Sequence, residues 1–290
     1  MPIPGLAIIG ESINDSIPST KKLYDAGDLD GIIALAKSQD EGGAAWIDVN
    51  VGRRPPAFMA DMVRRVQSVT AKPLSIDTPD PELAKAALEA YDAGRAGGKM
   101  PILNSISPLR MGMLDLHKVR PFMAIFLVCE RTEGGAGKPN RTVEETVATA
   151  REMVAAVKAS GLGISNNQLI FDPGIGPIAS DIEGMLGRVL GSIRAIHAGP
   201  AFAGAHISVG LSNFSHMLPS KKADGTPVKG AIENAFLTRA MPIGLDFIIG
   251  SVKRKYEILP EGHPALACLD GAAGIAGEDA LDLVVQFYSA

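Results

Sequence analysis

The chain has 290 residues, of which 46% are hydrophobic and 21% are charged, a composition typical of a globular protein with a large core. Aromatic residues make up 5% and the formal net charge is −4, which excludes a stacking platform or a basic surface for nucleic acid and anionic membranes. Two cysteines without C-x-x-C spacing, no long apolar segment and an N-terminus unlike a signal peptide predict a cytoplasmic protein.

Eight short apolar runs recur along the chain and are predicted to be strands. Their hydrophobicity is nearly continuous rather than alternating, which is typical of parallel strands covered on both faces. The predicted strands are residues 6–10, 44–51, 73–77, 101–106, 122–128, 168–173, 206–212 and 245–251.

Amphipathic segments alternate with these runs and are predicted to be helices. One of them begins with Thr142 and Glu145, a capping-box signature. Residues 132–141, 220–230 and the glycine-rich 271–277 are expected to be loops. The predicted helices are residues 28–43, 57–69, 81–94, 112–120, 142–161, 181–198, 230–243 and 277–288.

The alternation of eight strands with eight helices predicts a single (β/α)₈ TIM barrel that occupies residues 1–290 as one domain. A doubly wound open sheet is the second choice. It is disfavoured because the first strand runs into IIGESIN rather than a G-x-G-x-x-G fingerprint.

Polar side chains follow the predicted strands at their C-terminal ends, where TIM barrels carry their chemistry. A single aspartate there is weak evidence, because aspartate also caps helices and turns. As a set, however, these side chains converge on one mouth, and buried polar groups need partners, so a ligand with matching hydrogen-bonding groups is predicted. The candidates are Glu11, Asn14, Asp48, Asn50, Asp77, Asn104, Ser105, Asp172, Ser212, Asn213, Ser215 and His216.

The ligand is predicted to be a neutral planar heterocycle with several N–H donors. Carboxylates accept hydrogen bonds and asparagine both donates and accepts, a combination that matches the 2-amino-4-oxo edge of a pterin. Few basic residues or Gly-rich turns lie at the strand ends, which disfavours a phosphate ligand. The five histidines are scattered, so no bound metal is expected, although the carboxylates leave a Mg²⁺ site open as an alternative.

Six short motifs occur in order along the chain: IIGESIN (8–14), WIDVNVG (46–52), SIDT (75–78), LNSIS (103–107), FDPG (171–174) and GLSNFS (210–215). Together they resemble the motifs of the pterin-binding (β/α)₈ family. This family includes dihydropteroate synthases, the folate domain of cobalamin-dependent methionine synthase and methyltetrahydrofolate–corrinoid protein methyltransferases. The second and last motifs are similar to the D-x-N-V-G and G-L-S-N-x-S motifs of the corrinoid methyltransferases in particular.

The resemblance implies a methyltransferase that moves a methyl group between N5 of tetrahydrofolate and the cobalt of a corrinoid (cobalamin). A corrinoid-binding protein would bring this cofactor, because the chain has no D-x-H-x-x-G motif. The resemblance also implies a homodimer, and Asn213 as the catalytic residue that hydrogen-bonds near N5. The implied pterin-binding residues are Glu11, Asp48, Asn50, Asp77, Asn104, Asp172, Gly210, Ser212 and Asn213.

Two other functions stay open. A dihydropteroate synthase would be expected to carry a lysine on the seventh strand and a Ser-Arg-x-His ending on the eighth; this chain has Ser212-Asn213 and, as a partial echo, Ser251-Val252-Lys253-Arg254. The other is a catalytically silent folate-binding scaffold for a corrinoid protein. His216 occupies a position where some family members carry glutamine, and it is a further candidate together with Ser215.

Overall fold

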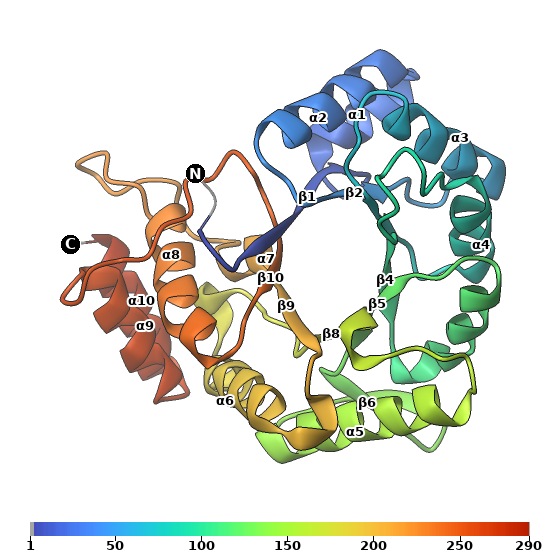
Figure 1. Cartoon of the computed structure of the whole chain (residues 1–290). Helices are drawn as coiled ribbons and strands as arrows, with labels where there is room; N and C mark the ends of the chain where they lie inside the picture. Colours follow the sequence, from blue (N-terminus) through green and yellow to red (C-terminus); the bar gives the residue numbers. More distant parts are fainter. Residues whose placement is uncertain (1–2, 290) are drawn as a thin grey trace.

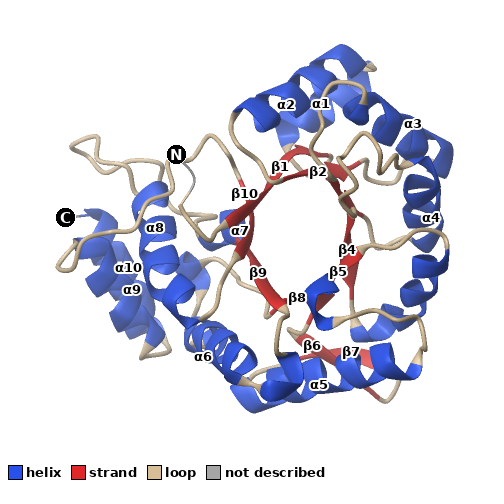
Figure 2. Ribbon diagram, in the orientation of Figure 1, coloured by secondary structure: helices blue, strands red, loops and turns tan. Residues whose placement is uncertain are grey.

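The computed structural model describes residues 3–289, and its centre is a closed barrel of eight parallel strands. Figure 2 shows the strands as a ring with the helices outside it. The predicted barrel is therefore confirmed, and all eight predicted strands are present. They are β1 (Ala7–Asn14), β2 (Trp46–Asn50), β3 (Leu74–Asp77), β4 (Ile102–Ile106), β5 (Met123–Leu127), β8 (Leu169–Asp172), β9 (His206–Gly210) and β10 (Phe247–Gly250).

Seven of the predicted helices are α-helices that surround the barrel (Figure 1). The capping box at Thr142 and Glu145 is present at the start of α5. The prediction for residues 112–120 was wrong in type, since Pro108–Lys118 form a 3₁₀ helix; Gly112 in its middle disfavours an α-helix. The seven are α2 (Leu29–Glu41), α3 (Pro56–Gln67), α4 (Pro81–Ala90), α5 (Val143–Ala159), α6 (Met185–Ala198), α8 (Lys229–Ala240) and α10 (Glu278–Ser289).

Several elements differ from the expected loops and strand ends. The segment expected to be a loop at 132–141 contains most of a hairpin, whose turn glycines Gly134 and Gly135 both have positive φ, as a type I′ turn requires. Residues 271–273 belong to a helix rather than a loop, because Gly271 leaves room for Leu283 of the next helix. The unpredicted elements are α1 (Pro18–Ala26), β6 (Glu130–Glu133), β7 (Ala136–Pro139), α7 (Leu211–Phe214), α9 (Pro264–Ala273) and short 3₁₀ turns at Asn166–Gln168, Ile178–Ser180, Pro200–Phe202 and Met241–Ile243.

The barrel interior is apolar in the middle of the strands and polar at their C-terminal ends. Successive side chains of a strand point to opposite faces, so residues two apart share one face. Ile9, Ile102 and Ile170 belong to one buried apolar cluster. Two residues further along the same strands stand Glu11, Asn104 and Asp172. The period of the strands thus carries polar side chains to the C-terminal mouth above a closed apolar layer.

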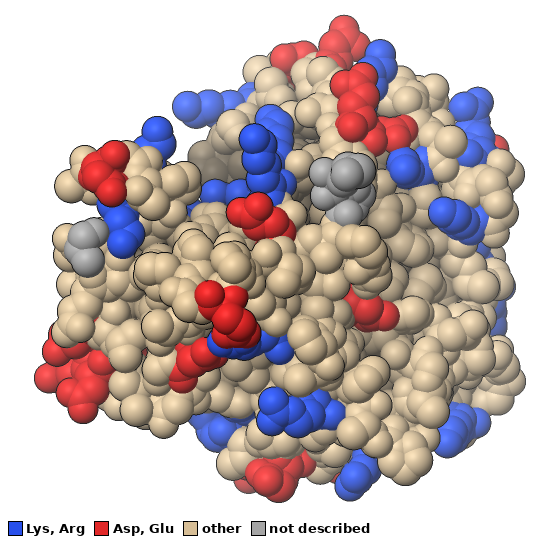
Figure 3. All heavy atoms as spheres, turned by 60° about the vertical axis from the view of Figure 1, so that its left-hand side comes forward, with Lys and Arg blue, Asp and Glu red and all other residues tan. Residues whose placement is uncertain are grey.

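The face of the molecule in Figure 3 carries side chains of both charges. In Figure 3, basic and acidic side chains are interspersed over the face in view. Across residues 3–289, no helix has both the length and the hydropathy that crossing a membrane requires.

Candidate active site

A cavity of about 480 Å³ opens at the C-terminal mouth of the barrel. It brings together side chains from the ends of β1, β3, β4 and β9, which lie far apart in the sequence. Several of the predicted pterin-binding residues line it, together with His216. The lining residues are Glu11, Asn14, Ser16, Ile17, Pro18, Asp77, Asn104, Gly210, Ser212, Asn213, His216 and Ile249.

Asp77 is the acceptor on which two neighbouring strand ends converge. Its Oδ2 accepts a hydrogen bond from Asn50 Nδ2 at 2.9 Å and another from Asn14 Nδ2 at 3.2 Å. Asn50 itself is fixed, because its Oδ1 accepts from the Gly52 backbone N–H at 2.8 Å. The Asp77 carboxylate is therefore oriented before any ligand arrives.

Asp48 lies deeper than the sequence suggested and does not line the cavity. Its side chain is 0% exposed, and the carboxyl group is surrounded by Ser75, Asn104 and Asp77. Burial, followed by the negative charge of Asp77, raises the pKa of Asp48 well above its usual range. Burial also raises the pKa of Asp77, an effect that its hydrogen bond from Asn50 partly offsets. The two carboxyl groups together therefore hold a proton to higher pH than an isolated aspartate does.

Glu11 lines the cavity as a second acidic side chain, in addition to Asp77. Burial raises the pKa of Glu11, the Ser212 hydroxyl partly offsets the rise, and the charge of Asp77 adds to it. The mouth thus presents carboxyl groups that can be acceptors or, when protonated, donors.

Asp172 stands buried at the end of β8 and, like Asn50, does not line the cavity. Its Oδ1 accepts from the Gly174 backbone N–H at 2.7 Å, and its Oδ2 accepts from Ser208 Oγ at 3.3 Å. Burial raises the pKa of Asp172 to about 6, although both hydrogen bonds and the charge of Arg188 lower it. Ser208 is a contact that the sequence did not indicate, because a serine inside an apolar strand looks like an ordinary core position.

The G-L-S-N-F-S motif ends the strand earlier than predicted. β9 stops at Gly210, and residues 211–214 form the single helical turn α7. Ser212 and Asn213 line the cavity from this turn, and the His216 backbone N–H donates to the Asn213 carbonyl oxygen at 3.1 Å. Ser215 does not reach the cavity: it is buried, and its hydroxyl donates to Glu233 on α8.

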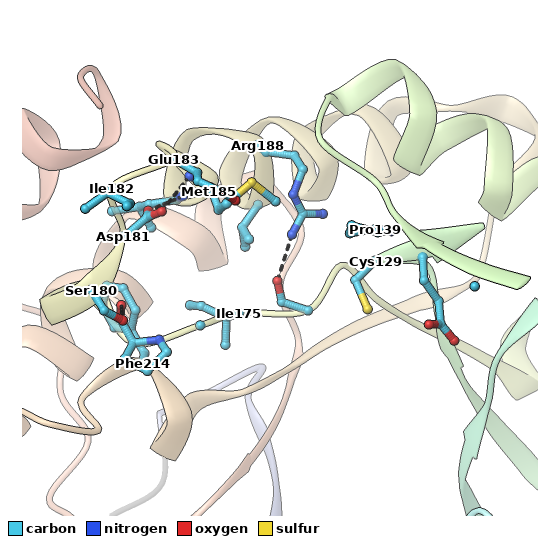
Figure 4. A pocket seen from close by; sticks show the side chains of 17 residues that line it. Cys129, Pro139, Ile175, Ser180, Asp181, Ile182, Glu183, Met185, Arg188 and Phe214 are labelled. Carbon is cyan, nitrogen blue, oxygen red and sulfur yellow. Dashed lines mark hydrogen bonds between the residues drawn. The ribbon is translucent and has the colours of Figure 1, made fainter. Parts of the chain in front are cut away.

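A second cavity of about 660 Å³ lies between the β6–β7 hairpin and the start of α6, and Gly174 in the loop after β8 lines it. Figure 4 shows Arg188 reaching from α6 to the Gly174 carbonyl oxygen, to which it donates at 2.9 Å. Its other amino group donates to Thr146 Oγ1 at 3.2 Å. Arg188 therefore supports the loop that holds Asp172, a role that a helical arginine does not reveal in the sequence.

The arrangement is suited to binding a polar planar ring. The acceptor Asp77 and the carboxamides of Asn104 and Asn213 reach the cavity from different strand ends, and the buried Asp172 stands at the end of another strand of the same mouth. Within residues 3–289, no group of three or more His, Cys, Asp and Glu side chains is arranged to hold a metal ion.

These features define a TIM barrel with a polar cavity at its C-terminal mouth. The sequence matches the model of the pterin binding enzyme family over residues 14–250, so the chain belongs to this family. The resemblance drawn from the six motifs is thereby confirmed.

Among curated proteins, the chain is similar to the methylcorrinoid:tetrahydrofolate methyltransferase of Eubacterium limosum, with 30% identity over 253 residues and 83% of each chain covered. Among solved structures, it is similar to a dihydropteroate synthase of Yersinia pestis in complex with a sulfonamide drug (TM-score 0.56, 17% identity, 94% of this chain and 96% of that chain). Another is the synthase of Thermus thermophilus (TM-score 0.54, 18% identity, coverage 85% and 87%). At these identities the structural likeness concerns the fold alone.

Proposed function

We propose that this protein transfers a methyl group between N5 of tetrahydrofolate and the cobalt of a corrinoid that a separate protein carries. The observation that carries the proposal is the cavity in which Asp77, Asn104 and Asn213 meet at the mouth of the barrel. Its volume of about 480 Å³ is within the range of small-molecule sites. The similarity to the Eubacterium limosum methyltransferase supports the same reaction.

The pterin ring would be held by hydrogen bonds from its N–H groups to fixed acceptors. Asp77 and Asp172 would accept from the ring, and Asn104 would both donate and accept. Asn50 orients Asp77 from outside the cavity, and Asp48 lies below it as a protonatable neighbour. Glu11, Gly210 and Ser212 would complete the wall around the ring.

Asn213 would act at the nitrogen that loses or gains the methyl group. The N5–methyl bond breaks with its electron pair left on nitrogen, and this nitrogen is a poor leaving group unless it is protonated or hydrogen-bonded. A neutral carboxamide does not deliver a proton, but its N–H can stabilise the charge that develops at N5. By analogy with oxyanion-hole amides, such a contact is worth roughly 10²–10³ in rate. The proton itself would come from solvent.

The corrinoid would supply the cobalt that accepts or donates the methyl group. The chain's own residues would bind the folate, orient N5 toward the mouth and stabilise the change of charge there. The same groups serve both directions, so the enzyme can load or unload the folate.

Dihydropteroate synthase activity is the alternative that the shared fold suggests. The surroundings of Arg254 argue against this activity. Arg254 follows β10 in the partial Ser-x-x-Arg echo, but its Nε lies 3.3 Å from the buried Glu233 Oε2. The arginine is thereby engaged within the protein rather than reserved for a substrate anion.

The corrinoid absorbance spectrum tests the proposal. Methylcobalamin, free and on a panel of corrinoid proteins, is mixed with tetrahydrofolate in the presence and absence of the enzyme. We expect enzyme-dependent loss of the methylcobalamin spectrum and formation of methyltetrahydrofolate. Absence of methyltetrahydrofolate binding at high micromolar concentration would overturn pterin recognition. Folate binding without spectral change for any corrinoid would instead support the non-catalytic scaffold.

A further inference from the structure

The helical turn that carries Asn213 is too short to be stable by itself. α7 has 4 residues and no side-chain cap at its start, and an isolated turn of this length is unstable in water. Asn213 is itself exposed, and Met217, four residues further on, has a positive φ of 69° that a non-glycine residue rarely adopts. The position of the Asn213 carboxamide must therefore come from contacts of its neighbours.

The two residues that follow Asn213 both dock on α8. The Phe214 ring packs against Phe236 with centroids 5.2 Å apart. The Ser215 hydroxyl donates to Glu233 Oε1. Residues three apart lie on the same face of a helix, so Glu233 and Phe236 form one platform under the turn.

The Glu233 carboxylate is unusual because it is buried inside the protein. Only 1% of it is exposed, a placement that is costly for a charged group without partners. Arg254, in the segment after β10, supplies the opposite charge at 3.3 Å. The carboxylate thus connects three elements: the α7 turn, α8 and the segment that follows the last strand of the barrel.

We propose that Glu233 is a positioning residue that, together with Arg254, holds Ser215 and thereby fixes the Asn213 carboxamide at the mouth. Glu233 does not line the cavity, and its hydrogen bond to the Asn213 segment is made through Ser215. The inference rests on the proposed function, since it assigns to Glu233 the orientation of the group that acts at N5. The role predicts a loss in the chemical step rather than in binding, because Asp77, Asn104 and Asp172 lie on other strands.

Three variants test this role by single-turnover kinetics and by calorimetric titration with methyltetrahydrofolate. Ser215→Ala and Glu233→Ala are expected to lower the rate of methyl transfer by about tenfold to hundredfold, as small misplacements of catalytic groups do, with folate affinity changed less than about twofold. Glu233→Gln keeps an acceptor for Ser215 and loses the charge that faces Arg254, so its rate should fall between wild type and Glu233→Ala. Equal losses in affinity and rate would contradict the positioning role.

Thr238→Val is the matched control on the same helix. Thr238 is also buried, and its hydroxyl donates to the Asn234 carbonyl oxygen at 2.7 Å and accepts from the Leu259 N–H at 2.9 Å, without contact to α7. This variant should lower the melting temperature without changing the transfer rate. If it slows transfer as much as Glu233→Ala does, the effect is general loosening of α8 and the inference fails.

Two further measurements separate this inference from the proposed function. In an Asn213→Ala background, Glu233→Ala should cause little additional loss of rate, because the hydrogen-bonded route through Ser215 to the carboxamide has been removed. Additive losses would overturn the role. In the free enzyme, amide hydrogen exchange over residues 211–218 should rise in Ser215→Ala and Glu233→Ala but not in Thr238→Val. Unchanged exchange overturns the inference whatever reaction the enzyme performs, whereas absence of methyl transfer by the wild type overturns only the proposed function.

Discussion

The Gly174 backbone N–H donates a 2.7 Å hydrogen bond to the Asp172 carboxylate, and only glycine fits at this position. Its φ is +67°, and a Cβ built there would lie 2.6 Å from Cys129 Cβ. The loop after β8 can therefore turn back on its own aspartate because residue 174 lacks a side chain. Arg188 then fixes the Gly174 carbonyl oxygen from α6.

Gly174→Ala is expected to destabilise the protein and weaken folate binding together. The left-handed backbone alone costs roughly 1–2 kcal/mol for alanine, and the contact with Cys129 forces the loop away from Asp172. Chemical denaturation and calorimetric titration with methyltetrahydrofolate measure the two effects. Gly176→Ala, two residues on, is the control, since no atom lies within 4 Å of its Cβ position and its φ is not positive. Similar behaviour of the two variants would rule out this account.

Asp172→Asn is expected to stabilise the free enzyme at neutral and alkaline pH. The pKa of Asp172 is raised from its ordinary value of 3.8 to about 6 in the folded protein. Between these values the folded state binds more protons than the unfolded chain, so the free energy of unfolding falls as pH rises and stays lowered above about pH 6. Asparagine has no such titration and keeps an oxygen for the Gly174 N–H. The gain should be on the order of 2–3 kcal/mol at pH 8 and small at pH 4.

The same variant should bind folate more weakly, because an anionic acceptor for pterin N–H groups is replaced by a carboxamide. In the wild type, folate affinity should decrease as pH falls through about 6, where Asp172 takes up its proton. Denaturation and titration across pH 5–8 measure both effects. A variant that is no more stable at pH 8, or that binds folate as tightly as wild type, would contradict the role of a buried ionised Asp172.

The barrel was predictable because its strands are apolar on both faces and carry their polar residues at the C-terminal end. Ile102 and Asn104 illustrate this, since two positions on one strand distinguish the apolar layer from the mouth. The depth at which each aspartate side chain lies in the barrel was not predictable. Asp48 and Asp77 look equivalent in sequence, yet of these two only Asp77 reaches the cavity. Glu233 was missed because a glutamate within a helix is normally solvated, and its partner Ser215 lies 18 residues away without a local pattern.

Asn213→Ala is expected to slow methyl transfer far more than it weakens folate binding. The carboxamide would contribute mainly when charge develops at N5, so its loss should reduce the single-turnover rate by roughly 10²–10³. Calorimetric affinity for methyltetrahydrofolate should change by less than about threefold, since the ring would be held by Asp77, Asn104 and Asp172. If rate and affinity fall together, or if neither falls, Asn213 has no special role in the transition state.

His216→Gln tests where the proton at N5 comes from. The imidazole lines the same cavity as Asn213 and is a proton carrier, whereas glutamine has similar reach and hydrogen-bonding groups but does not exchange a proton. If solvent supplies the proton, the variant should transfer the methyl group within about threefold of the wild-type rate; general acid catalysis by His216 would instead make the loss about 10²-fold or more. Single-turnover rates, with folate affinity measured alongside, distinguish the two. We expect the small effect, because the His216 side chain is exposed to solvent, which can supply the proton itself.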